Sequence, residues 1–334
     1  MKKSNIANCF FLFIGTILIL CAGLRPVGLD RDSSNYIQIL HISLKDADFF
    51  DKEPGFWFLN ELNNLFFNGD VNHLFIMFSV LGVSLKLLAI RKLSLNPVLS
   101  VFLYITLYFI LHEMTQMRVG VASGLFLLGL YDLCNDNKKS FFLKISIATL
   151  FHYSAILGFL VLFFDKKKIN KIFYTLIPLF SVLVSAIFDT SSFVRMTSYI
   201  LPGFIQYKLE LYSNLLKEGE YSDINIFNFY YISLLFFYLF FVFISDKTKS
   251  SLDILLIKIF GAMMFSFYAF TFLPVVAFRV SEFLGIVIII LMANAAKWFK
   301  IESRFIYILI IVIWGMAYFI SQGIMKNLNF EALS

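Results

Sequence analysis

Two arginines stand at the starts of apolar segments of this sequence. Arg118 lies at the start of the segment 117–134, and Arg279 directly precedes the segment 280–296. A guanidinium is permanently charged, and its planar fork of N–H donors pairs with two phosphate oxygens. The two arginines therefore predict phosphate binding beside apolar surface. Anchoring of helix ends, or contact with lipid headgroups, is the alternative explanation.

A histidine lies at the midpoint of the apolar stretch 141–164, which reads FFLKISIATLFHYSAILGFLVLFF. Imidazole forms hydrogen bonds in both its neutral and its protonated form, so His152 is a candidate functional group. A packed core histidine with its hydrogen bonds satisfied is the alternative.

A carboxylate precedes a Pro-Gly turn in the stretch DKEPGFWFLN. The apolar segment 56–67 that follows is too short to cross a membrane, so we expect an interfacial helix. Glu53 at this bend is a candidate general base for a sugar hydroxyl. A role as ion-pair partner for one of the arginines is equally compatible with the pattern.

The composition predicts the elements that must position these groups. The chain has 334 residues, of which 60% are hydrophobic and only 15% charged, and its apolar runs approach 20 residues. Such runs match a hydrocarbon core of about 30 Å, so we expect an all-α polytopic integral membrane protein. About nine full spans are predicted, near 6–24, 71–90, 97–113, 117–134, 169–188, 225–245, 252–272, 280–296 and 305–322.

The stretch 141–164 is left over, and lysines flank it on both sides. If it enters the membrane and returns as a re-entrant hairpin, most lysines fall on the cytoplasmic side and most acidic residues fall outside, as the positive-inside rule requires. The N-terminus is then cytoplasmic and the C-terminus outside. His152 would mark the floor of an outward-facing cleft. This count places Lys86 at a cytoplasmic helix end and Glu113 outside.

The same topology leaves arginine as the predominant outer cation. The predicted outer arginines are Arg25, Arg31, Arg118, Arg195 and Arg279. We expect a single transmembrane domain over 1–334 with two long outer loops, about 25–70 and 190–223. Both loops mix aromatic residues with carboxylates and amides, as sugar binding requires, although membrane-interface belts have a similar composition.

Metal, disulfide and cofactor chemistry have weak support. The three cysteines lie in or beside predicted spans, so neither a disulfide framework nor a metal cluster is indicated. The sequences DRD at 30–32 and DAD at 46–48 match the DxD pattern of some metal-binding sites. Both are short enough to arise by chance in an acidic loop. No metal site and no cofactor are expected.

With these residues in view, the chain resembles the EpsG/Wzy family of polysaccharide polymerases. The matching pieces occur in the order of the family: Asp30 or Asp32 with Tyr36, the EPGF stretch at 53–56, Arg118 to Ala122, His152 to Ala155, and Arg279. The resemblance implies a metal-independent glycosyltransferase with a GT-C-like architecture in the bacterial cytoplasmic membrane. It would polymerise undecaprenyl-diphosphate-linked repeat units on the outer side, building O-antigen or exopolysaccharide.

The resemblance also implies roles for residues. Arg118 and Arg279 would hold the leaving diphosphate, with Arg195 closing from the second loop and His152 bonding the diphosphate or donor sugar. Glu53 would be the base. Further substrate-binding candidates are Asp30, Arg31, Tyr36 and Tyr199. Expected partners are the lipid-linked glycan, the bilayer and a chain-length regulator, with no nucleic acid.

Other classes are compatible with the sequence. A lipid-linked-sugar flippase or transporter would favour internal repeats and polar residues along several helices at mid-depth. Here the strongly charged positions crowd to one face, and we find no repeat. An O-antigen ligase or a membrane O-acyltransferase would also use His and Arg, and no residue identifies the acceptor.

Overall fold

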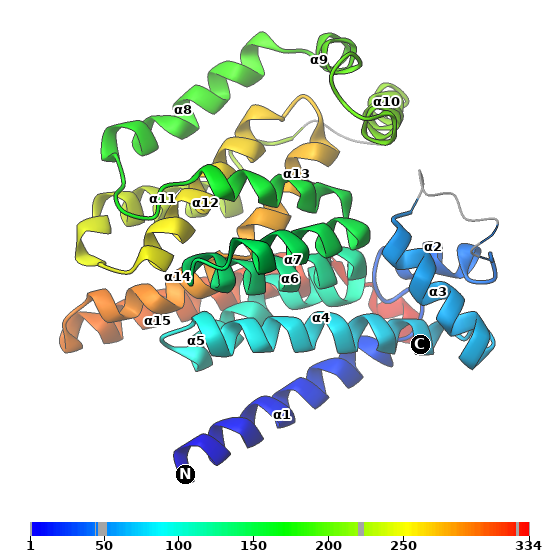
Figure 1. Ribbon diagram of the computed structural model, residues 1–334, viewed down its shortest axis with the longest axis horizontal. Helices are drawn as coiled ribbons and strands as arrows, with labels where there is room; N and C mark the ends of the chain where they lie inside the picture. Colours follow the sequence, from blue (N-terminus) through cyan, green and yellow to red (C-terminus); the bar gives the residue numbers. More distant parts are fainter. Residues whose placement is uncertain (1, 44, 46–51, 220–223, 325–326, 334) are drawn as a thin grey trace. The chain divides into compact units, whose positions relative to one another are not determined.

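The computed structural model describes residues 2–43, 45, 52–219, 224–324 and 327–333. These residues form helices and their connections, and the only pairing of extended backbone among them is one bridge between Asp30 and Leu328 (Figure 1). The all-helical prediction is confirmed for this part of the chain.

Five helices are long and apolar enough to cross a membrane, or up to seven if two bent pairs each count as one span. The five are Val71–Leu93, Pro97–Thr115, Met117–Cys134, Ser251–Ala269 and Ile301–Ser321. The bent pairs are Lys171–Ile187 with Thr190–Thr197, at 93°, and Pro274–Gly285 with Ile288–Trp298, at 43°. Nine crossings, the sides of the two termini and the GT-C-like architecture stay predictions.

The chain divides into two compact units, residues 1–159 with 289–334 and residues 160–288. The helices of the first unit are α1 (Lys2–Gly23), α2 (Ser33–Ile39), α3 (Pro54–Phe67), α4 (Val71–Leu93), α5 (Pro97–Tyr104), η2 (Ile105–Thr115), α6 (Met117–Cys134), α7 (Lys138–Phe151), η5 (Ala296–Trp298), α15 (Ile301–Tyr318), η6 (Phe319–Ile324) and η7 (Phe330–Leu333). Those of the second unit are α8 (Lys171–Ile187), α9 (Thr190–Thr197), α10 (Gly203–Lys217), α11 (Phe229–Phe243), η4 (Ser245–Lys247), α12 (Ser251–Ala269) and α13 (Pro274–Gly285). The boundaries fall within η3 (Tyr153–Phe163) and at the start of α14 (Ile288–Ala295). That the chain acts as one transmembrane domain stays a prediction.

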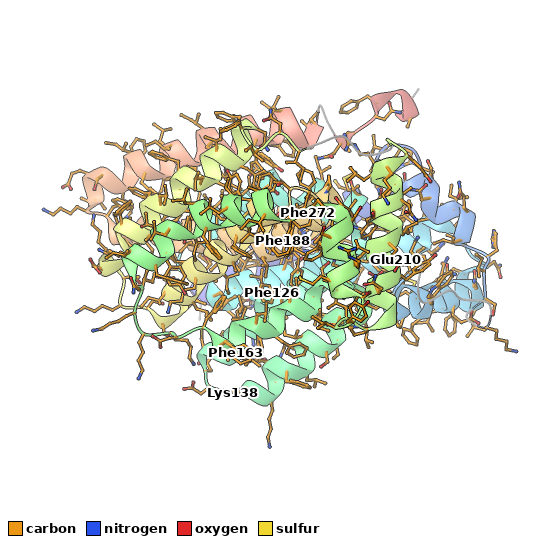
Figure 2. The ribbon with its side chains drawn as sticks, turned by 90° about the horizontal axis from the view of Figure 1, so that it is seen from above. Phe126, Lys138, Phe163, Phe188, Glu210 and Phe272 are labelled. Carbon is orange, nitrogen blue, oxygen red and sulfur yellow. The ribbon has the colours of Figure 1, made fainter. Side chains whose placement is uncertain are left out.

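Small residues let the helices of the first unit pack closely. A Cβ on Gly124 of α6 would lie 2.7 Å from the Leu85 Cβ of α4, and one on Gly23 of α1 would lie 2.6 Å from Ile76. Phe126 on α6 is fully buried and lies among these helices (Figure 2). Such close backbone approach is typical of helix packing in membrane proteins.

The chain folds back on itself at His152. The residue has extended backbone, with φ −155° and ψ 116°, between α7 and η3. The rings of Phe142 and Phe159 lie 4.9 Å apart, although a straight helix would separate residues so far apart in sequence by about 25 Å. The chain therefore turns back at this point, as the predicted hairpin requires. Its entry into the membrane from one side, and a cleft above it, stay predictions.

The two predicted outer loops contain helices of their own. The loop 25–70 carries α2 and α3, and the described part of the loop 190–223 carries α9 and α10. The short helix expected after Glu53 is thus α3, and Pro54 occupies its first turn, where proline costs no hydrogen bond.

Candidate active site

Glu53 is held at the start of α3 by the residues around it. It is the N-cap of the helix and has extended backbone, with φ −69° and ψ 152°. Gly55 follows two positions later, and a Cβ there would lie 2.9 Å from the Leu150 carbonyl oxygen and 2.9 Å from the Phe151 ring. Glycine therefore lets α3 begin directly against the end of α7. This contact brings the Glu53 carboxylate to the break at His152.

Arg118 reaches the same carboxylate from the first turn of α6. Its guanidinium Nη1 donates to Glu53 Oε2, and the guanidinium is also hydrogen-bonded to the buried Tyr36 hydroxyl on α2. The Arg118 side chain is 15% exposed, against 3% for Glu53. Arg118 is therefore the member of the pair that a ligand can reach.

His152 completes the cluster from the break between α7 and η3. Its Nδ1 lies 3.4 Å from Glu53 Oε1, and the His152 side chain is 5% exposed. The Tyr153 backbone N–H donates to the same oxygen over 3.3 Å. Glu53 thus connects α3, α6 and the α7–η3 break. The structure brings four sequence-predicted residues together, namely Glu53, Arg118, His152 and Tyr36.

The protonation states in the cluster follow from its charges. Burial raises the pKa of the Glu53 carboxyl, but the Arg118 guanidinium and the hydrogen bond from His152 outweigh burial and hold that pKa well below its usual value. Burial also raises the pKa of the Tyr36 phenol, more than Arg118 lowers it. At neutral pH the site therefore contains a carboxylate and a protonated phenol around one permanent cation.

Aromatic side chains hold these groups in place. Tyr36, Phe56, Trp57, Phe78 and Met117 belong to one buried cluster. The Tyr36 and Phe56 rings stack with their centroids 5.7 Å apart. Packed aromatic walls of this kind restrict the rotamers of the polar groups beside them.

Two of the predicted residues near the cluster are parts of a structural clamp. The Asp30 carboxylate accepts from Arg25 Nε over 2.7 Å and from the Ser33 backbone N–H over 3.1 Å, and both ionic side chains are fully buried. Arg25 also donates to the Met114 carbonyl over 2.6 Å and lies over the Phe75 ring. The guanidinium therefore joins the segment after α1 to α4 and to the end of η2. A role of Asp30 toward an acceptor stays a prediction, as does one for the exposed Arg31.

The first unit also contains a buried ion pair, between Lys86 and Glu113, that the sequence analysis did not predict. Lys86 Nζ on α4 lies 2.5 Å from Glu113 Oε1 and donates to the Gly120 carbonyl over 2.6 Å, and the Tyr104 hydroxyl donates to Glu113 over 2.9 Å. Placing Lys86 inside and Glu113 outside was therefore wrong. The charge count treats every lysine near a helix end as solvated, whereas this side chain points into the helix bundle and is fully buried.

Glycines make room for this pair. A Cβ on Gly82 of α4 would lie 2.0 Å from Glu113 Oε2, and one on Gly120 of α6 would lie 3.0 Å from it. Within the described part of the chain, that oxygen has no hydrogen-bond partner. Glycine at 82 and 120, facing an acidic residue in an adjacent apolar segment, is the sequence signal that the charge count overlooked.

The other predicted residues belong to the second unit. Arg279 on α13 donates to the Tyr212 hydroxyl of α10 over 2.5 Å and lies over the same ring. Arg195 lies in the last turn of α9, and Tyr199, just beyond that helix, is 88% exposed. Their roles toward substrate stay predictions.

Among the described residues, no group of three or more His, Cys, Asp or Glu side chains is placed to hold a metal ion. In the acidic stretch at 30–32, Asp30 is bonded to protein groups. The stretch at 46–48 lies outside the described residues.

The fold and the cluster define a class of protein. An all-helical chain with five to seven apolar helices of spanning length is a multi-pass membrane protein, and this one holds a buried carboxylate, guanidinium and imidazole where α3, α6 and α7 meet. The model of the EpsG family matches residues 8–332, so the chain belongs to the EpsG family of Wzy-like polysaccharide polymerases. No curated protein and no solved structure matches it significantly.

Proposed function

We propose that the protein is a glycosyltransferase that polymerises oligosaccharide repeat units linked to undecaprenyl diphosphate, on the outer side of the bacterial cytoplasmic membrane. The observation that carries the proposal is the cluster of Glu53, Arg118 and His152 in a chain of the EpsG family. The cluster combines an accessible cation with groups that fix its direction. Such a site suits a reaction whose leaving group is a diphosphate.

In the proposed reaction, the bond between the anomeric carbon of the donor chain and the diphosphate oxygen breaks. A hydroxyl of the acceptor unit forms the new glycosidic bond and gives up its proton, and the lipid diphosphate leaves as the anion. Negative charge therefore grows on the leaving oxygen. A guanidinium already aimed at that oxygen stabilises the transition state more than the ground state, which is the role we give Arg118.

Glu53 holds Arg118 and His152 in this proposal and is not the base. A carboxylate that accepts from a guanidinium and from a backbone N–H, and whose pKa lies below its usual value, is a weak proton acceptor. Pairing Nδ1 with a carboxylate fixes the direction of an imidazole ring. We therefore propose His152 as the group that bonds the reacting oxygens and takes the acceptor proton.

Reconstitution tests the reaction directly. Purified protein in lipid vesicles is supplied with one lipid-diphosphate-linked repeat unit, and the products are separated by gel electrophoresis. A ladder of longer chains with release of lipid diphosphate supports the proposal. Transfer of unchanged repeats across the bilayer without lengthening would identify a flippase and overturn it.

Substitution of His152 separates two roles. Glutamine keeps a hydrogen-bond donor but does not take up a proton at neutral pH. If His152 takes the acceptor proton, His152→Gln and His152→Ala lose polymerisation to the same extent, about a hundredfold or more. If the glutamine variant keeps most of the activity, His152 only bonds the diphosphate or the donor sugar.

A further inference from the structure

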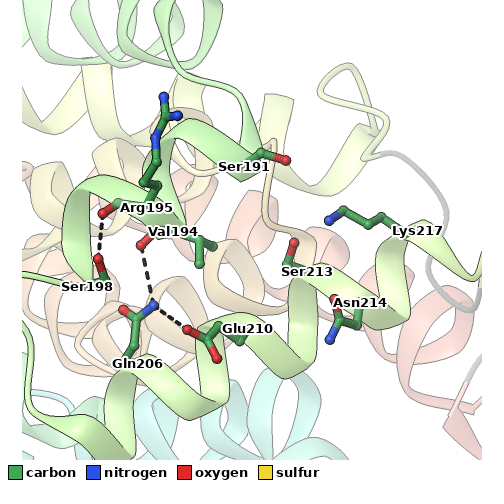
Figure 3. Close-up of a pocket in the computed structure, with 9 residues that line it drawn as sticks. All are labelled: Ser191, Val194, Arg195, Ser198, Gln206, Glu210, Ser213, Asn214 and Lys217. Atoms are coloured by element: carbon green, nitrogen blue, oxygen red, sulfur yellow. Dashed lines mark hydrogen bonds between the residues drawn. The ribbon is translucent and has the colours of Figure 1, made fainter.

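The second unit contains a polar pocket that the proposed reaction does not use. Helices α9 and α10 line an open pocket of about 410 Å³, which Figure 3 shows with its lining residues. This volume falls within the range of small-molecule sites, about 300–1,000 Å³. Its walls, however, are mainly polar, whereas most ligand pockets are mainly apolar. A polar ligand is the occupant that such walls suit.

The pocket follows from the way the two helices are patterned. On α10, Gln206, Glu210, Ser213, Asn214 and Lys217 all line the pocket, and their spacing places them on one helical face. On α9 and just beyond it, the lining residues Ser191, Arg195 and Ser198 follow the same helical period. Each helix therefore presents its polar face to the other.

Apolar side chains on the same segment point elsewhere. Met196 is 47% exposed, Tyr207 46% and Leu211 38%, and none of them lines the pocket. In water, an amphipathic helix normally buries its apolar face and exposes its polar one. Here the lining residues Arg195, Glu210 and Lys217 are exposed as well, so the pocket opens to the surface of the unit, and the exposed apolar side chains beside it suit helices that lie at a membrane surface.

Hydrogen-bonding capacity in the pocket is incompletely used. Gln206 Nε2 donates to Glu210 Oε1 over 2.8 Å and to the Val194 carbonyl over 3.4 Å. Its buried Oε1 has no hydrogen-bond partner within the described part of the chain. Ser213, which is 5% exposed, lines the same pocket. Buried polar atoms are rarely left unpaired in proteins, so the Gln206 amide oxygen points to a bound ligand.

The remaining side chains define what the ligand must offer. Figure 3 shows Ser213 pointing from α10 toward α9, with the Lys217 ammonium directed back over the same space. Hydroxyls and amides both donate and accept hydrogen bonds, as sugar hydroxyls do. The lining includes one carboxylate, Glu210, and the Lys217 ammonium, whereas Figure 3 shows the Arg195 guanidinium directed away from α10.

From these observations we infer that the pocket between α9 and α10 is a glycan subsite, which binds sugar residues of the lipid-linked chain at a distance from the bond that reacts. The assignment of a glycan, as the class of ligand, rests on the proposed function. Arg279 positions this subsite, because its bond to Tyr212 ties α10 to α13. The subsite would hold the glycan by its hydroxyls and leave its diphosphate free.

Binding to the full-length protein tests the inference. The probe is the oligosaccharide released from the cell's own polysaccharide, without lipid or phosphate, and binding to detergent-solubilised protein is measured by titration calorimetry. Ser213→Ala and Asn214→Ala should each weaken binding about threefold to tenfold, the loss of one hydrogen bond. Lys217→Met should weaken it similarly. Lys208→Met is the matched control, since Lys208 lies on the same helix but does not line the pocket, and it should bind as the wild type does.

Inorganic pyrophosphate distinguishes a glycan from a phosphate site. The inference requires that pyrophosphate leaves oligosaccharide binding unchanged. It is overturned if the wild type does not bind the oligosaccharide or if the pocket variants bind it normally. It is also overturned if those variants lose pyrophosphate binding in its place. An Arg118→Ala protein should still bind the oligosaccharide, because Arg118 does not line the pocket. Failure of the polymerisation assay and failure of the glycan subsite are therefore read from separate measurements.

Discussion

At the scale of single residues, the side chain that matters most is Arg118, because it combines a permanent charge with a fixed direction. Its Glu53 partner occupies one edge of the guanidinium, and the Tyr36 hydroxyl makes a further contact. The exposed part of the side chain is what a diphosphate can approach. A cationic side chain that populated several rotamers would not be aimed at the leaving oxygen in advance, and it would stabilise the transition state less.

Arg118→Lys should reduce polymer formation about a hundredfold or more, even though the charge is kept. Lysine has no planar fork, so it does not bond Glu53 and a phosphate oxygen in the same geometry. Polymerisation in reconstituted vesicles is the measurement. Arg91→Lys, at an exposed position near the end of α4, serves as the control and should leave the rate unchanged. Normal chain lengths from the Arg118→Lys protein would remove Arg118 from the proposed mechanism.

Glu53→Gln should lower the free energy of unfolding by about 3–5 kcal/mol, because it leaves the Arg118 guanidinium, whose side chain is only 15% exposed, without its partner. The folded-state pKa of Glu53 lies below the unfolded value of about 4.3. The ion pair therefore contributes fully above that value and is lost only as the pH falls through the folded-state pKa. Thermal unfolding in detergent should show the same difference between wild type and variant at pH 7 and at pH 5. A difference that disappears by pH 5 would contradict a lowered pKa.

At the scale of elements, the site depends on how closely α3 approaches α7. The contact brings the N-cap of one helix to the C-terminal end of the other, and glycine at position 55 permits it. The motif EPGF thus has a structural meaning at each of its first three positions. Glu53 supplies the carboxylate, Pro54 starts the helix and Gly55 leaves space for α7.

Gly55→Ala should impair polymerisation and lower the melting temperature, because the added Cβ would lie 2.9 Å from a carbonyl oxygen and an aromatic ring. The cost expected for overpacking is about 1–3 kcal/mol. Gly203→Ala is the matched control, since a Cβ there meets nothing within 4 Å. Equal effects of the two substitutions would show that the α3–α7 contact does not position Glu53.

Tyr212→Phe tests how Arg279 acts. If Arg279 serves by holding α10 through the Tyr212 hydroxyl, the phenylalanine variant should weaken oligosaccharide binding as strongly as Arg279→Ala does. If Arg279 itself contacts the diphosphate, Tyr212→Phe should retain binding while Arg279→Ala loses polymerisation. Calorimetry with the free oligosaccharide and the vesicle assay together separate the two outcomes.

At the scale of the whole molecule, the sidedness of the loops determines which reaction is possible. We expect Lys167 and Lys168 on the cytoplasmic side and Tyr199 outside, and all three side chains are exposed. In a protein whose three cysteines have been replaced by serine, Tyr199→Cys should react with an impermeant maleimide added to intact cells. Lys167→Cys should react only after the cells are opened. Labelling of both positions from outside would contradict the re-entrant hairpin.

Much of the helical content was predictable because apolar length is a local property of the chain. Each predicted span corresponds to a helix or a bent helix pair, as at 117–134 and 252–272. Bends were harder to predict. The 43° bend between α13 and α14, for example, follows Gly285 inside the predicted span 280–296.

Residue types alone identified Arg118, His152 and Glu53 as chemically unusual, because charged and titratable side chains are costly to place in or beside apolar segments. Only the tertiary structure decided which of them meet. Glu53 and Arg118 are 65 residues apart and Lys86 and Glu113 are 27 apart, and pairing over such separations depends on packing between helices. The sequence by itself therefore determined a chain of apolar helices of membrane-spanning length, with a few charged side chains whose burial must be compensated by partners. The fold-back at His152 and the close approach of α3 to α7 bring one carboxylate, one guanidinium and one imidazole into a single site. Contacts of this kind join distant segments, so they depend on backbone geometry that no local sequence pattern encodes.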